Sequence, residues 1–221
     1  MLKSVFLKEW LKIRWIWLLA LIINLCALGY LLLTVRHQFK VEHSEMIWYW
    51  VFELRRLLFD AIKYVPLLTG AMIAVAQFLP EMISNRFRLS LHLPIRADVL
   101  VWSWVGFGAL MGGLIMVVYA VGLYFIISGW FPEEAAVSAV LTAAPWLLAG
   151  WVAYFGVTLI MMEPHAPHKV FYMALSLAFI GLLYQEKGYQ EYDEALPVLA
   201  CMAALFVLTV ILPAHRYRHH S

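Results

Sequence analysis

The sequence predicts an all-α integral membrane protein with six transmembrane helices, an interfacial amphipathic helix at the N-terminus, and both termini in the cytoplasm. The first observation is composition: hydrophobic residues make up 64% of the chain and charged residues 14%. In soluble domains roughly 45–50% of the residues are apolar and about 25% are charged. We therefore expect residues 1–221 to form one transmembrane domain, with too little polar sequence for a separate soluble domain.

The second observation is the number of long apolar stretches, because about 20 helical residues cross the hydrocarbon core of a bilayer. The predicted spans are 14–35, 63–82, 98–128, 135–162, 169–186 and 195–213. The apolar runs are unbroken, whereas the strands of a membrane barrel alternate apolar and polar residues. The spans are therefore predicted to be helices, and the first is expected to stay as an anchor rather than be cleaved as a signal peptide.

Residues 1–13 are predicted to form a short amphipathic helix in the membrane interface before the first span. Their apolar side chains recur at spacings of three and four: Leu2, Phe6, Trp10, Ile13 and Trp17. The charged side chains fall largely on the rest of the helix surface, which is typical of an interfacial helix. The alternative is that this segment is simply the start of the first span.

Residues 46–62 are predicted to form an outer helix that leads into the second span. The segment begins with an apolar, aromatic run and then carries Glu53, Arg55, Arg56 and Asp60. So many charges argue against a further span. The favoured role is to cap the bundle, and the alternative is a gate.

The third observation is the distribution of charge between the spans, because short cytoplasmic loops are enriched in basic residues. Basic residues gather in four segments that share one side if there are six spans: Lys3, Lys8, Lys12 and Arg14; Arg86, Arg88 and Arg96; Lys169; Arg216 and Arg218. The other side receives mostly acidic residues: Glu133, Glu134, Glu186, Glu191, Asp193 and Glu194, with Lys187. This asymmetry predicts that both ends of the chain are cytoplasmic.

Motifs for chemistry are absent from the sequence. It has no phosphate-binding GxxxxGK[ST] loop, no HExxH, no GxSxG and no dinucleotide-binding glycine pattern. We therefore expect no catalytic residue, cofactor or metal in this chain. No ionisable residue is expected deep within a span, so transport would have to be driven from outside the bilayer. The net charge of +2 gives no support for binding nucleic acid.

A small cluster, Glu163, His165 and His168, follows the fourth predicted span. Such residues could bind a metal, but Pro164 and Pro167 interrupt helical presentation and the position is at the cytoplasmic edge. The favoured interpretation is solvated loop histidines. The alternative is an integral-membrane enzyme that uses this cluster.

Residues 83–96, between the second and third spans, are the most informative loop. Gln77 and Glu81 lie four residues apart at the end of the second span, and Arg86, Phe87 and Arg88 follow. Leu91, Leu93, Pro94, Ile95 and Arg96 then lead into the third span. A short basic and apolar helix can enter a groove of a partner protein. It can equally be a positive-inside loop held by lipid headgroups.

Residues 77–105 resemble the first cytoplasmic loop of ABC-2-type transporter permeases. The N-terminal Lys8-Glu9-x2-Lys12 is also similar to the start of that family, whereas Trp102-Ser103-Trp104 departs from its pattern. The resemblance implies a permease subunit of an ATP-driven exporter in a bacterial inner (plasma) membrane. A separate ABC ATPase would bind ATP and Mg²⁺, and a second permease copy or paralogue would complete the complex. The implied coupling contacts are Glu81, Arg86, Phe87, Arg88 and Arg96. A non-enzymatic membrane scaffold of a larger complex is a further alternative.

Overall fold

The structure, a computed structural model, describes residues 2–54, 56–83, 97–185, 188–210, 212–213 and 216. Within these ranges every regular element is a helix, which confirms the predicted all-helical fold. The helices are α1 (Leu2–Val41), α2 (Ser44–Phe52), the short 3-10 helix η1 (Asp60–Ile62), α3 (Val65–Ile83), α5 (Ala97–Ser128), α6 (Glu133–Met162), α7 (Ala166–Leu183) and α8 (Leu196–Thr209).

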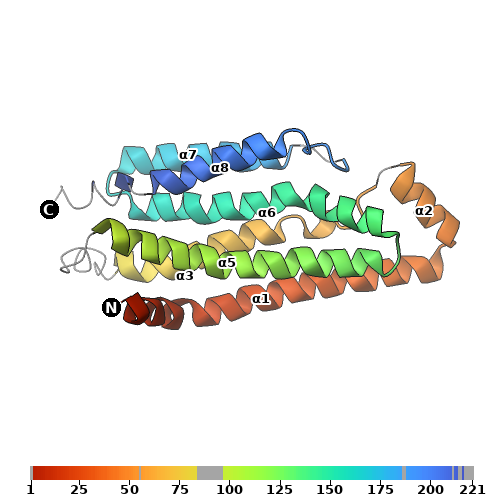
Figure 1. The fold of residues 1–221 in the computed structure, drawn as a ribbon, viewed down its shortest axis with the longest axis horizontal. Coiled ribbons are helices and arrows are strands. Elements are labelled where there is room, and N and C mark those ends of the chain that lie inside the picture. The colour runs from red at the N-terminus through yellow and green to blue at the C-terminus, as the bar shows by residue number, and fades with distance from the viewer. Residues whose placement is uncertain are drawn as a thin grey trace.

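The long helices run alternately up and down one common axis (Figure 1). α6 is the central element: it packs against α3 and α5 on one side and against α7 and α8 on the other. α1 completes the bundle against α3 and α5. Small residues allow helices to approach closely, and a Cβ atom added at Gly70 of α3 would overlap the backbone carbonyl of Gly150 in α6. This glycine pair allows the backbones of α3 and α6 to approach closely.

Five of the predicted spans coincide with helices that are long and apolar enough to cross a membrane. These are Ser4–Val41, Asp60–Ile83, Val99–Ser128, Glu133–Met162 and Ala166–Leu183. The sixth prediction, 195–213, coincides with α8, an apolar helix of 14 residues. At about 1.5 Å per residue α8 is about 21 Å long, less than the roughly 30 Å of a bilayer core. The described residues therefore support five spans, and the sixth is a shorter apolar helix.

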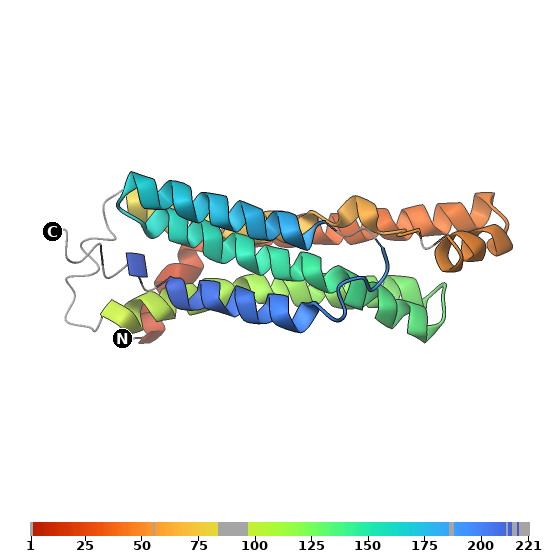
Figure 2. The same ribbon diagram turned by 90° about the horizontal axis from the view of Figure 1, so that it is seen from above.

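The N-terminal segment is not the predicted separate helix and matches the alternative, the start of the first long helix. Residues 2–13 are not a separate element but the first turns of α1, which continues unbroken to Val41. These turns are inclined to the rest of the helix (Figure 2). The burial of Glu9, which is 1% exposed, was not expected for a charged residue of this segment. The physical reason is that neighbouring helices offer partners to the Glu9 carboxylate, as described below.

The predicted outer helix is present as α2, which lies at the end of the bundle far from the N-terminus (Figure 1). Its buried residues, Ile47 and Val51, join a cluster that also contains Phe59 and Tyr119. Trp48 and Phe52 pack their rings near Phe131. These contacts fit the favoured role of capping the bundle.

Candidate functional site

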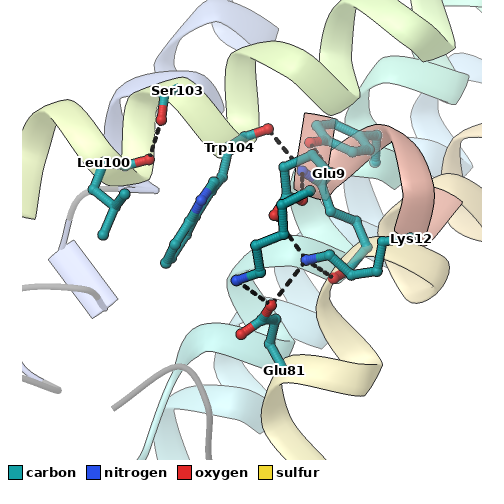
Figure 3. Close-up of polar contacts among 9 residues, drawn as sticks. Glu9, Lys12, Glu81, Leu100, Ser103 and Trp104 are labelled. Carbon is teal, nitrogen blue, oxygen red and sulfur yellow. Dashed lines mark hydrogen bonds and ion pairs between the residues drawn. The ribbon is translucent and has the colours of Figure 1, made fainter. Parts of the chain in front are cut away.

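The structure describes one of the predicted coupling residues, Glu81, in the last turn of α3. Its side chain is buried, and its Oε1 atom lies 2.8 Å from Lys8 Nζ and 3.1 Å from Lys12 Nζ (Figure 3). Both lysines come from the N-terminal turns of α1. The end of α3 is therefore tied to the start of α1 by two ion pairs.

Lys12 is the centre of this arrangement. Its ammonium group lies 2.9 Å from Glu9 Oε1, 3.1 Å from Glu81 Oε1 and 3.1 Å from the carbonyl oxygen of Gln77. An ammonium group has three N–H donors. Lys12 thus has one acceptor for each of its donors, and it bridges two carboxylates that would otherwise repel each other.

Gln77 extends the contacts from α1 and α3 to α5 and α6. It is fully buried, and its Nε2 atom donates to Glu9 Oε2 at 3.0 Å and to the Trp104 carbonyl at 2.7 Å. The Tyr154 hydroxyl lies 2.9 Å from Gln77 Oε1 and 3.0 Å from the carbonyl oxygen of Val105. A Cβ atom at Gly108 would overlap both Gln77 Oε1 and the Tyr154 hydroxyl. The glycine therefore provides the space in which these groups meet.

We call this set the Glu9–Glu81 network; it consists of Lys8, Glu9, Lys12, Gln77, Glu81 and Tyr154. It joins α1, α3 and α6 through side chains and reaches α5 through backbone carbonyls. Two carboxylates face two ammonium groups, so the charges balance. Buried charges are tolerated when they are paired and hydrogen-bonded, and removal of one partner is strongly destabilising. The network is consequently suited to holding four helices in a fixed arrangement.

The other predicted coupling residues, Arg86, Phe87, Arg88 and Arg96, lie outside the described residues. The structure adds Glu9, Lys12 and Tyr154 to the site, none of which the sequence had assigned to it. The sequence placed Glu9 and Lys12 in an interfacial segment, and in the structure both belong to the first turns of α1 and contact the bundle. A usable signal was present, since Lys8, Glu9 and Lys12 recur at helical spacing just before the first apolar stretch.

The second polar cluster lies where α6 ends and α7 begins. The Glu163 side chain has no exposed surface, and its Oε2 atom lies 3.1 Å from Arg216 Nη1. Its Oε1 atom faces Nδ1 of His165 at 3.4 Å and Nδ1 of His168 at 3.7 Å. The imidazoles are 38% and 48% exposed. The expectation of solvated histidines thus fits the two rings, whereas the placement of Glu163 at the wet edge is wrong.

Local sequence explains the turn that builds this cluster. A residue before proline is disfavoured in helical conformation, and Glu163, which precedes Pro164, is extended with φ −78° and ψ 127°. His165 is also extended and forms the N-cap of α7, and Pro167 lies in the first turn, where a proline is tolerated. This short connection places the side chains of Glu163, His165 and His168 close to one another.

The chain matches no protein-family model, no curated protein and no solved structure. The class of protein is therefore given by the fold alone. In the part of the chain that the structure describes, it is an all-helical protein with five helices long and apolar enough to cross a membrane. Two clusters with buried carboxylates lie at one end of its bundle.

Proposed function

We propose that this chain is the membrane-spanning permease subunit of an ATP-driven ABC exporter. A separate ATPase chain would supply the energy of ATP hydrolysis and would act on the connection between α3 and α5. The observation that carries the proposal is the Glu9–Glu81 network, because it joins both ends of that connection to the rest of the bundle. The topology expected from the sequence is part of the proposal: α8 is the sixth span, and this connection and both termini lie in the cytoplasm.

Both helices that flank the connection take part in the network. Glu81 and Gln77 lie in the last turns of α3, and the Trp104 carbonyl lies near the start of α5. Lys12 links the same point to α1, and Tyr154 links it to α6. A force on the connection would therefore act on four helices together. Transporters commonly use such rigid-body motion to change the side on which they are open.

Because Glu81 is buried, we give it a different role from the ATPase contact that the family resemblance implied. A residue that enters a cleft of a partner needs an accessible side chain, and Glu81 is 4% exposed. In the proposal Glu81 anchors the connection within the subunit. The contacts with the ATPase are left to Arg86, Phe87, Arg88 and Arg96, and a second permease copy completes the transporter.

The test is a detergent pull-down of the tagged chain from its native host, with identification of the proteins that accompany it. We expect an ATPase with a phosphate-binding loop in stoichiometric amount, and we expect Arg86→Glu with Arg88→Glu to release it. The matched control reverses two exposed charges at the opposite end of α1, Arg36→Glu with Lys40→Glu, and should keep the ATPase bound. Recovery of the chain without any ATPase would contradict the proposal.

A further inference from the structure

The cluster at the α6–α7 turn brings together three side chains that could bind a metal ion. Three potential metal-binding atoms, one each from Glu163, His165 and His168, lie within 4.8 Å of one another. The two histidine nitrogens converge on the same carboxylate oxygen rather than one on each. The inference drawn from this cluster does not depend on the proposed transport function.

The separations between these atoms are compatible with the ligand set of a metal ion. Hydrogen bonds from nitrogen to oxygen measure about 2.7–3.2 Å, and the two Nδ1 to Oε1 distances are 3.4 and 3.7 Å. Zn²⁺ binds nitrogen and carboxylate oxygen at roughly 2.0–2.2 Å, so two ligands of a tetrahedral ion lie about 3.3–3.6 Å apart. The two observed distances are at the long end for hydrogen bonds and close to two edges of such a tetrahedron, and all three ligand atoms lie within 4.8 Å of one another.

The surroundings of Glu163 also fit a metal ligand. Arg216 contacts Oε2 at 3.1 Å, and Oε1, which also faces the backbone N–H of His165 at 3.4 Å, is directed at the two imidazoles. Carboxylates that bind metals are commonly oriented in this way by a second hydrogen-bonding group. The carboxylate itself is enclosed, whereas the half-exposed histidine rings leave a path from solvent. Three protein ligands with an open fourth position are typical of zinc sites that keep a water or bind a further ligand.

We propose that Glu163, His165 and His168 form a binding site for a divalent transition-metal ion, with Zn²⁺ as the best match. The donor set of one carboxylate and two imidazoles suits zinc and its neighbours rather than Mg²⁺ or Ca²⁺, which prefer oxygen ligands. The bound ion would fasten the end of α6 to the start of α7. It would lie at the end of the bundle where α3 ends and α1 begins (Figure 1).

The experiment is a calorimetric titration of the purified full-length chain in detergent with Zn²⁺, after removal of metal with a chelator. We expect one ion per chain. Loss of a group that only supports a metal ligand weakens binding about 10–100-fold, so His168→Asn and the double change His165→Ala with His168→Ala should weaken it at least tenfold. His168→Asn is the safer variant because its half-exposed ring contributes little to folding, and a thermal unfolding curve without metal checks this.

Two controls separate this site from other histidines. His219→Ala with His220→Ala removes the histidines near the C-terminus, and His37→Ala with His43→Ala removes a pair near the opposite end of α1. Neither should change the affinity or the stoichiometry. The proposal would be overturned by wild-type and His168→Asn chains that bind Zn²⁺ equally, by loss of binding in a control variant, or by no binding at all.

Discussion

The two polar clusters lie at the same end of the bundle and both enclose a buried carboxylate, but their partners differ. Glu81 faces ammonium groups at 2.8 and 3.1 Å, and the three donors of Lys12 are all used. Glu163 faces one guanidinium at 3.1 Å and two imidazoles at 3.4 and 3.7 Å. In the first cluster each carboxylate is held by ammonium groups, whereas in the second the two imidazoles share one carboxylate oxygen at longer distances. The comparison suggests that one cluster holds helices together and the other accepts an ion.

The largest effect is expected from Lys12→Met, which removes the central cation of the Glu9–Glu81 network. Glu9 and Glu81 would then lie buried without their shared partner, and breaking a buried ion pair costs about 3–5 kcal/mol. Unfolding of the purified chain in mixed micelles by denaturant should measure this loss. Arg14→Met, two residues along the same helix but exposed, is the control and should change the stability by less than about 0.5 kcal/mol. Equal effects of the two changes would show that the network does not hold the helices.

A smaller effect is expected from Tyr154→Phe, which keeps the ring but removes the hydroxyl. Gln77 Oε1 and the carbonyl of Val105 would lose a buried donor, and an unsatisfied buried group costs about 1–3 kcal/mol. The same unfolding measurement applies. Tyr30→Phe is the control, because Tyr30 is 57% exposed and should tolerate the change. An unchanged stability in Tyr154→Phe would show that the Tyr154 hydroxyl does not tie α6 to the network.

The contrast between these residues also shows what the sequence could reveal. Glu81 was selected because the family resemblance implied a coupling contact at the end of the second span, and its spacing of four residues placed it on the same helix face as Gln77. Glu9 was placed among the charged residues of an interfacial helix, and nothing local in the sequence indicated that it is buried. Glu9 can be buried because Gln77, which is distant in sequence, donates a hydrogen bond to it. Glu163 can be buried because it pairs with Arg216, which is also distant in sequence. Helix periodicity predicts helices well but says nothing about such partners.

Lys8→Met should have a modest effect although Lys8 makes the shortest contact with Glu81, 2.8 Å. Its side chain is 46% exposed, so water and salt screen the pair, and pairs of this kind contribute about 0–1 kcal/mol. The change should reduce stability by no more than this amount, and added salt should diminish the difference from wild type. A loss as large as that of Lys12→Met would mean that Lys8, not Lys12, is the essential cation.

The smallest effect is expected from His168→Asn in the absence of metal, and it tests the other half of the comparison. The imidazole is 48% exposed and lies too far from Glu163 for a hydrogen bond, so the metal-free stability should change by less than about 0.5 kcal/mol. With saturating Zn²⁺ the wild-type chain should gain stability because an ion that binds only the folded state shifts the equilibrium toward it. The variant should lose most of this gain, since it lacks one of the three ligands. A large loss without metal would instead make His168 a structural partner of Glu163, and the two clusters would then serve the same purpose.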